Sequence, residues 1–353
     1  MSGTDQSANS GAGPVRAGME FDTSALTGWM SAHVDGFSGP IRVTQFNGGQ
    51  SNPTYKIDAN GKSYVLRRKP LGVTLKGAHA IEREVRVLEA LGRSGFPVPH
   101  VHGLCMDDTV LGSWFYIMDM VEGRIFWDAT IPGVRTAERP SYFNALCDTM
   151  ARLHTFDHVA AGLADFGRTG NFFERQIKRW SKQYRDDAEA GQDPNMDLLI
   201  EALEARIPED DETCLVHGDF RCDNVIFHPT EPRILAVLDW ELSTLGNPLA
   251  DFAYHALMYR MPPNIVAGLV GADLAALNIP TEGAYLADYC ARTGRQVPED
   301  WDFYLAFNFF RLAAIFHGIK GRVIRGTASS ANASARAESF PVLARLGRET
   351  LGN

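Results

Sequence analysis

The residues best suited to chemistry lie in one polar loop near the centre of the chain. This loop follows the short apolar run Cys214–Val216 and precedes a second one, Val225–Phe227, so we expect buried strands on both sides of it. It carries four side chains that could coordinate, donate or accept: His217, Asp219, Arg221 and Asn224. Fifteen residues after Asn224, a third apolar run ends on Asp239, and Glu241 follows two positions later.

A carboxylate, an amide and a second carboxylate in this order suit the transfer of a phosphoryl group. One carboxylate must orient an attacking hydroxyl and take its proton, while a second carboxylate and an amide oxygen hold the metal ion that bridges the phosphates. We therefore predict Asp219 as the base, and Asn224 and Asp239 as ligands of Mg²⁺. This hypothesis requires that the loop and the strand returning from it bring the three side chains within reach of one ion.

The spacing of these residues resembles that of a kinase catalytic loop. His217-Gly218-Asp219 followed by Asn224 matches the motif His-Arg-Asp-x-x-x-x-Asn, with glycine in place of arginine. The chain is similar to the aminoglycoside phosphotransferase and choline kinase branch of the protein-kinase-like fold, and within it to the kinase domain associated with acyl-CoA dehydrogenases. The resemblance extends from about Phe46 to Asp251 and implies ATP and Mg²⁺ as cofactors.

The same resemblance implies the fold and its division. It implies a two-lobed, protein-kinase-like α+β fold, with an antiparallel sheet and a helix in the N-lobe and a larger, mostly helical C-lobe. We place a disordered segment at residues 1–18, the N-lobe at 19–118, the hinge at 119–123, and the C-lobe at 124–353 with an insertion at 158–212. The resemblance implies that the Asp119 carbonyl and the Val121 amide meet adenine, and that Asp251 braces the catalytic loop from below.

The remaining polar residues of the central motif have narrower interpretations. We interpret His217 as an architectural hydrogen-bonding member of the catalytic loop instead of a proton carrier. Arg221 occupies the place where protein kinases put a lysine that meets the transferring phosphate, so it is a candidate charge stabiliser. Glu241 is either a second metal contact or a solvated carboxylate. Cys222 is interpreted as a small filler.

The predicted nucleotide side begins with strands and a glycine loop. Ile41–Phe46 reads as a strand, and Asn60-Gly61 between two alternating runs predicts a hairpin. Adjacent glycines allow backbone amides to turn toward an anion, so the loop after the first strand could cap the nucleotide phosphates. Its candidate residues are Gly48, Gly49, Ser51 and Asn52. A plain hairpin loop is the alternative.

A cation and a helical carboxylate complete this side. Arg67 stands where many kinases have the strand lysine, and we predict that it anchors the phosphates, with Lys69 as the alternative on the same strand face. The run 74–91 has a helical apolar stripe, and Glu84 borders it. We therefore predict an ion pair between Glu84 and Arg67, with Glu82 as the alternative.

Further helices are expected in the C-lobe. The predicted segments are 140–156, the insertion helix with the stripe Phe173, Ile177, Trp180 and Tyr184, then 261–277, 281–293 and 301–324. In the insertion, Arg175, Lys178, Arg179 and Lys182 either form a solvated face or hold an anionic substrate group. Residues 162–169 mimic a phosphate-binding loop, but no strand precedes them, so we reject that reading. Residues 326–336 suggest a flexible link or a weak helix.

Composition limits the classes of function. The 353 residues are 45% hydrophobic and 22% charged, as in ordinary globular proteins, and the net charge of −9 argues against a general nucleic-acid or membrane-surface binder. Five dispersed cysteines without a Cys-x-x-Cys pair indicate reduced thiols and a cytoplasmic protein. The richest apolar window, 304–319, is interrupted by Asn308, Arg311 and His317, so we expect a buried helix there. The partner is a small molecule, and the sequence leaves monomer and homodimer open.

The sequence therefore predicts a small-molecule phosphotransferase of the alcohol-acceptor type. The acceptor is a hydroxyacyl-CoA or hydroxy acid, or alternatively an aminoglycoside. A protein kinase is disfavoured because only eleven residues separate Asp239 from Asp251, too few for the segment that binds protein substrates. A catalytically inactive nucleotide-binding module is the alternative from another class.

Overall fold

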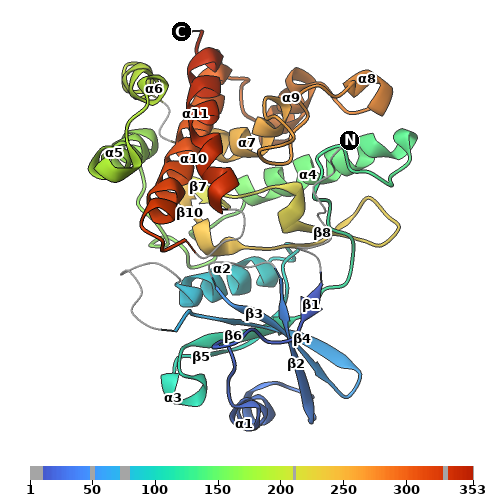
Figure 1. Cartoon of the computed structure of the whole chain (residues 1–353). Coiled ribbons are helices and arrows are strands. Elements are labelled where there is room, and N and C mark those ends of the chain that lie inside the picture. The colour runs from blue at the N-terminus through green and yellow to red at the C-terminus, as the bar shows by residue number, and fades with distance from the viewer. Residues whose placement is uncertain (1–10, 48–51, 72–79, 210–211, 329–332, 353) are drawn as a thin grey trace. The chain divides into compact units, whose positions relative to one another are not determined.

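The computed structural model describes residues 11–47, 52–71, 80–209, 212–328 and 333–352 and divides the chain into two compact units (Figure 1). The first unit comprises Met1–Arg124 and Val225–Glu241, and the second comprises Ile125–Asn224 and Leu242–Asn353. The hairpin that follows the central polar loop thus groups with the first unit by its contacts, although it lies within residues 124–353, the range predicted for the C-lobe.

The first unit is built on an antiparallel sheet of six strands in the order β1-β2-β3-β4-β6-β5. Its described strands are β1 (Ala12–Gly13), β2 (Ile41–Phe46), β3 (Thr54–Ala59), β4 (Lys62–Arg68), β5 (Val101–Cys105) and β6 (Phe115–Asp119). Its helices are α1 (Thr23–His33), α2 (Ile81–Arg93) and α3 (Asp108–Leu111), and a separate hairpin pairs β8 (Val225–Phe227) with β9 (Ile234–Val237).

The Asn60-Gly61 turn forms as predicted and sets the register of the sheet. Both residues have positive φ, 43° and 79°, which is the backbone of the two-residue turns that suit twisted hairpins. The turn pairs Ala59 with Lys62, and the ladder then places Arg67 opposite Thr54. On its other side, β4 pairs Arg67 with Tyr116 of β6. A short turn therefore determines which residues surround Arg67.

The two faces of the sheet pack against different helices. One face, with Tyr55, Ile57, Tyr64 and Leu66, forms an apolar core with residues of α1. Successive side chains of a strand point to opposite faces, so Arg67 turns to the other face, where it contacts Glu84 of α2. Helix α2 and helix α1 lie on opposite sides of the sheet (Figure 1). The central strand β4 is thus buried on both faces. Because the charged residues at its end, Arg67 and Arg68, are also buried, they require hydrogen-bond or ion-pair partners.

The N-terminal prediction is wrong in part. The segment 1–18 was expected to be disordered, but Ala12–Gly13 forms β1 and pairs with the edge of β2. Arg16 fastens this pairing, because its guanidinium donates to the carbonyl oxygens of Phe46 and Asn47 at 3.0 and 2.9 Å. An open strand edge supplies backbone partners that composition does not reveal.

The second unit is mainly helical. Its described helices are α4 (Arg139–His154), α5 (Phe172–Asp186), α6 (Pro194–Glu204), α7 (Pro248–Ala256), α8 (Leu274–Leu277), α9 (Glu282–Thr293), α10 (Trp301–Ile324) and α11 (Ala333–Thr350). Two short strands, β7 (Cys214–Val216) and β10 (Thr244–Gly246), pair antiparallel. The 3₁₀ turns are η2 (Thr136–Glu138), η3 (Ala188–Ala190), η4 (Cys222–Asn224), η5 (Trp240–Leu242) and η6 (Leu257–Tyr259).

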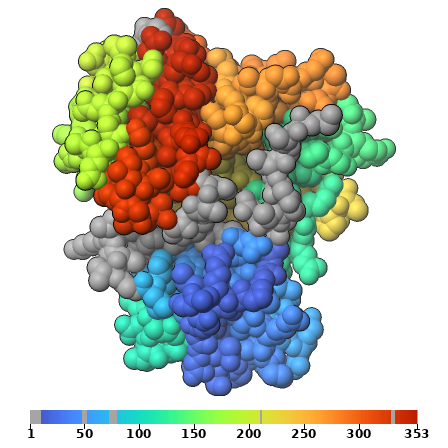
Figure 2. All heavy atoms as spheres, viewed as in Figure 1, coloured from blue at the N-terminus to red at the C-terminus, as the bar shows by residue number. Residues whose placement is uncertain are grey.

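Helix α10 is the core of this unit, as its apolar sequence predicts. Side chains of α5 and α6 lie directly beside those of α10 and α11 in the space-filling view (Figure 2). The three polar residues that interrupt its apolar window each engage a carbonyl oxygen: Asn308 that of Ala250, Arg311 that of Gly218 and His317 that of Gly191. A buried polar group requires such a partner, so these residues tie α10 to neighbouring segments.

One prediction for the second unit is wrong. Residues 261–273 were expected to be helical, but they form turns, and only Leu274–Leu277 is helical. For residues 326–336 the sequence left a flexible link and a weak helix open, and the described residues from Ala333 onward belong to helix α11, which packs on α10 and α6. Strand β7, which precedes the polar loop, pairs with β10.

No helix in the described ranges combines the length and the apolar character that crossing a membrane requires.

Candidate active site

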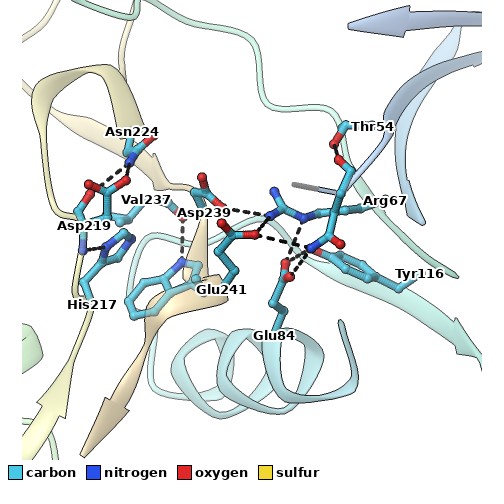
Figure 3. A network of polar contacts seen from close by, with 12 residues as sticks. Thr54, Arg67, Glu84, Tyr116, His217, Asp219, Asn224, Val237, Asp239 and Glu241 are labelled. Atoms are coloured by element: carbon cyan, nitrogen blue, oxygen red, sulfur yellow. Dashed lines mark hydrogen bonds and ion pairs between the residues drawn. The ribbon is translucent and has the colours of Figure 1, made fainter. Parts of the chain in front are cut away.

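In the first unit, Arg67 lies at the centre of a buried polar cluster (Figure 3). Its Nε lies 3.0 Å from Oε2 of Glu84, so the predicted pair between strand and helix is present. Its terminal nitrogen lies 2.8 Å from Oδ1 of Asp239 and 3.2 Å from Oε2 of Glu241. Glu241, whose role the sequence left open, therefore contacts Arg67 and is not a solvated carboxylate.

Glu84 is fixed by two further donors. The Tyr116 hydroxyl donates to its Oε2 at 3.0 Å, and the Asn52 amide donates to its Oε1 at 3.0 Å. Glu84 is 2% exposed and Arg67 9% exposed, so this pair is shielded from water. The alternative residues, Lys69 and Glu82, instead pair with each other at 2.8 Å in a more exposed position.

Burial and charge compete within this cluster. Burial raises the pKa of Glu84, although the neighbouring Arg67 charge opposes the shift. Burial also disfavours the charge on Arg67, but the carboxylates of Asp239 and Glu84 outweigh burial and raise the pKa of Arg67. Three carboxylates surround one guanidinium, so the cluster carries an excess of negative charge that a divalent cation would balance.

Asp239 has the features of a functional position. Its φ is 65°, a left-handed conformation that costs a non-glycine residue about 1–2 kcal/mol. Such strain is found mainly at functional sites. Its side chain is 34% exposed, and carboxylate oxygens suit Mg²⁺, which takes one or two carboxylates together with phosphate oxygens and water. The residues present therefore fit the implied ion, and Asp239 is the carboxylate available to hold it.

In the second unit, Asp251 anchors the backbone of the catalytic loop, as the resemblance implied. Its two oxygens accept hydrogen bonds from the amides of His217 and Gly218, both at 2.8 Å. His154 is a neighbour at 3.1 Å, and its other ring nitrogen contacts Tyr289 at 2.6 Å. Burial opposes the charge of Asp251, but these hydrogen bonds outweigh it and lower the pKa of Asp251. His154 is thus a structural residue.

The backbone at position 218 explains why this loop has glycine where protein kinases have arginine. Its φ is 82°, and a Cβ atom there would lie 2.8 Å from the carbonyl oxygen of Leu242. A side chain at this position meets a strained backbone and a clash with a neighbouring main chain at once. Glycine therefore allows the loop to turn close to the residues that follow Glu241.

The side chain of Asp219 is held from several directions. The Tyr254 hydroxyl donates to its Oδ1 at 2.6 Å. The Asn224 amide donates to its Oδ2 at 3.0 Å and to its backbone carbonyl at 2.9 Å (Figure 3). Both amide hydrogens of Asn224 point to Asp219, so the amide oxygen is the atom that would meet a cation. Arg221 lies 3.4 Å from Oδ1 of Asp219.

Two other members of the loop have supporting contacts. The ring of His217 is fully buried and accepts the Asp219 amide on Nδ1 at 3.1 Å, which is the architectural role predicted for it. Arg221 also pairs with Asp223 at 2.9 Å. Burial disfavours the charge on Arg221, but Asp219 and Asp223 outweigh it and raise the pKa of Arg221. Arg221 therefore brings a fixed positive charge next to Asp219, the predicted base.

These two clusters carry the residue types of a known enzyme family. The model of the phosphotransferase enzyme family matches residues 42–307. The chain belongs to this family. The predicted family is confirmed.

Curated relatives and solved structures agree with this assignment. Mouse acyl-CoA dehydrogenase family member 10 is 43% identical over 336 residues, which cover 94% of this chain and 31% of that protein. Human acyl-CoA dehydrogenase family member 11 is 39% identical, with 93% and 43% covered. The chain thus spans less than half the length of these relatives.

A crystal structure from Ralstonia eutropha, provisionally assigned as an aminoglycoside phosphotransferase, is 48% identical with a TM-score of 0.86, and the match covers 94% of this chain and 99% of that one. A thermostable aminoglycoside phosphotransferase mutant in a ternary complex with ADP and hygromycin B has a TM-score of 0.60 at 15% identity, covering 92% and 99%. That likeness concerns the fold alone. Together they confirm the predicted kinase-like α+β fold.

For some of the predicted site residues, the hydrogen bonds and ion pairs described above give no information. Gly48, Gly49 and Ser51 lie outside the described residues. The hinge expectation for Asp119 and Val121 concerns backbone groups and stays a prediction. Asp119 is the last residue of β6 instead of the first of a loop, and its carboxylate lies 2.8 Å from Nε2 of His102.

Asn52, which was predicted to cap the nucleotide phosphates, directs its side-chain amide to Glu84 and Glu241. Sequence reasoning missed three other residues of the two clusters. Tyr116, Tyr254 and Arg311 hold Glu84, Asp219 and the Gly218 carbonyl, respectively. A signal existed for two of them. Tyr254 lies three residues after Asp251 and so shares its helix face, and Arg311 is a cation inside an apolar helix. Neither signal indicates which residue Tyr254 or Arg311 would contact.

Proposed function

We propose that this phosphotransferase moves the γ-phosphoryl group of ATP, together with Mg²⁺, onto a hydroxyl group of a small molecule. The observation that carries the proposal is the held carboxylate of Asp219, in a loop whose backbone Asp251 anchors. A base must be positioned before it can take a proton from an attacking hydroxyl. Membership of the phosphotransferase family supports this role.

The proposed reaction assigns a role to each cluster. Asp219 takes the proton of the acceptor hydroxyl, the oxygen forms a bond to the γ-phosphorus, and the bond to the bridging oxygen breaks as ADP leaves with the electron pair. Arg67, held by Glu84, contacts the nucleotide phosphates, and Arg221 offers positive charge to the transferring group. Asn224 and Asp239 would hold Mg²⁺, which would neutralise phosphate charge when bound.

For the acceptor we propose a hydroxyacyl-CoA or hydroxy acid. The names of the relatives, acyl-CoA dehydrogenase family members 10 and 11, support this class. So does a groove of about 350 Å³ at the start of α5, which is lined by Arg175, Lys178 and Glu174 among others. Two cations there suit an anionic group such as a phosphate of CoA.

An aminoglycoside is the second candidate acceptor, and the provisional assignment of the Ralstonia chain favours it. Protein substrates are disfavoured because residues 240–250 are taken up by η5, β10 and the start of α7. That stretch leaves no separate segment for binding a peptide.

Transfer of labelled phosphate from ATP tests the proposal. Wild type and D219N are incubated with Mg²⁺ and [γ-³²P]ATP against hydroxyacyl-CoAs, hydroxy acids, aminoglycosides, choline and a peptide library. We expect labelled acyl-CoA or acid with wild type, and a loss of about 10²–10⁴-fold in kcat with D219N, which still binds MgATP. If an aminoglycoside is labelled instead, the proposed acceptor class is wrong and the second candidate is correct. If MgATP binds but no compound is labelled, the protein is an inactive nucleotide-binding module.

A further inference from the structure

Tyr254 makes a short hydrogen bond to Asp219, the predicted base. Its hydroxyl donates to Oδ1 of Asp219 at 2.6 Å. It lies on α7, three residues after Asp251, so one face of this helix holds both the loop backbone and the side chain of the base. Burial and the adjacent Asp219 charge raise the pKa of Tyr254, so its hydroxyl remains a donor.

The ring of Tyr254 is itself fixed. The guanidinium of Arg311 lies 5.4 Å from the ring centroid and donates to the Gly218 carbonyl at 2.8 Å. The ring also lines a small cavity of about 30 Å³, whose other walls include Met258, Met261 and Leu312. The contact with Arg311 of α10 thus restrains the ring of Tyr254 while its hydroxyl bonds Asp219.

The two oxygens of Asp219 have different partners. Oδ1 accepts from Tyr254, which comes from a rigid helix, whereas Oδ2 accepts from Asn224, which belongs to the loop itself. Each carboxylate oxygen has a second lone pair. With Oδ1 anchored to the helix, the carboxylate cannot rotate about its terminal bond, and Oδ2 keeps one orientation toward an incoming hydroxyl.

We propose that Tyr254 is a positioning residue for phosphoryl transfer, which holds the carboxylate of Asp219 in the one orientation that accepts the proton of the acceptor. This inference rests on the proposed function. Tyr254 acts through Asp219 and is not assigned contact with nucleotide. Its hydroxyl is therefore expected to affect the transfer step and not the binding of ATP.

The variant Y254F tests this inference, because it removes one oxygen and keeps the ring against Arg311 and the cavity. We expect kcat to fall about 10- to 100-fold with the KM for ATP within twofold of wild type, and a larger share of ATP to be hydrolysed by water. Y259F is the matched control. The hydroxyl of Tyr259 is also buried in this unit, without a hydrogen-bond partner among the described residues, so Y259F should keep wild-type kcat.

Two further measurements separate positioning from a purely structural role. In the D219N background, Y254F should cause no additional loss of kcat, because a residue that acts through Asp219 has nothing left to position. A crystal structure of the wild type should show Asp219 in one side-chain conformer, whereas a crystal structure of Y254F should show it in two. Equal losses in both backgrounds, or a single unchanged conformer in Y254F, would overturn the inference. The crystallographic comparison decides it even if no acceptor is ever phosphorylated.

Discussion

At the scale of single residues, Arg67 shows how a buried ion pair depends on each of its partners. Glu84 is almost fully buried and its carboxylate relies on Arg67, Tyr116 and Asn52. Removing one partner of a buried pair leaves the other charge without compensation, and that costs more than the intact pair contributes. The sequence predicted the ion pair between Arg67 and Glu84, whereas the extent of its burial became known only from the folded structure.

R67A should therefore lower the free energy of unfolding by about 3–5 kcal/mol and abolish binding of MgATP. K69A is the matched control, since Lys69 pairs with Glu82 at 2.8 Å in a more exposed position, and it should cost less than about 1 kcal/mol and keep nucleotide binding. Urea denaturation and isothermal titration with MgATP measure both effects. Equal stability losses for the two variants would contradict the assignment of Arg67 as the anchor.

Gly218 allows a second test at this scale. G218A places a Cβ atom 2.8 Å from the Leu242 carbonyl at a φ of 82°. G271A has a comparable φ of 86° but nothing within 4 Å of the added atom. We expect G271A to cost about 1 kcal/mol through backbone strain alone, and G218A to cost about 1–3 kcal/mol more and to lose transferase activity. Thermal unfolding of both variants gives the difference, and similar losses would exclude the clash.

At the scale of elements, α7 is the support of the catalytic loop. The helix begins at Pro248 as the sequence predicted, with Asn247 as a cap that accepts from the Ala250 amide at 3.0 Å. From this start, Asp251 and Tyr254 share the face that meets the loop. The start of the helix is a local signal, but its contact with the loop depends on the pairing of β7 with β10.

D251N should disconnect the loop from this support. The substitution keeps the size of the side chain but replaces one of the two acceptor oxygens with an NH₂ group, whose hydrogens would face one of the two backbone amides. We expect unfolding to become easier by about 2–4 kcal/mol and kcat to fall at least tenfold. Circular dichroism in urea and the transfer assay provide the two readouts. A stable D251N with full activity would show that the loop holds its shape unaided.

At the scale of the whole molecule, buried titratable groups link stability to pH. Burial lowers the pKa of His255 to about 4 from its ordinary 6.5. Between these two pH values the unfolded chain binds a proton on this histidine that the native protein does not bind. Stability therefore falls as pH falls through this window, by up to about 1.4 kcal/mol per pH unit from this group.

Urea midpoints of wild type and H255Q between pH 4 and 7.5 test this linkage. Wild type should lose stability on acidification from about pH 6.5, and H255Q should show a shallower dependence in the same window. Asp251, whose pKa is lowered, contributes at a more acidic pH, since its stabilisation is present above the ordinary carboxyl pKa of 3.8 and is lost below it. Parallel pH profiles for the two proteins would assign the effect to other groups.

The sequence by itself determined the features that depend on neighbouring residues. Asn60-Gly61 specifies its own turn, helical periodicity marks α2, α9 and α10, and the spacing of His217, Asp219 and Asn224 identifies the family. These signals are local because turn geometry, helix periodicity and loop spacing each involve only a few consecutive residues. For the same reason they failed at residues 261–273, where an apolar run forms turns instead of a helix.

The tertiary structure alone decided which distant side chains share a hydrogen bond. Tyr254 and Asp219 are 35 positions apart, Arg311 and Gly218 are 93 apart, and Asn52 reaches Glu241 across 189 residues. No spacing rule relates such pairs, because their meeting depends on how strands and helices pack. The sequence could therefore name Asp219 and Arg67 as the candidate base and the candidate phosphate anchor, while the residues that hold them became known only once the chain was folded.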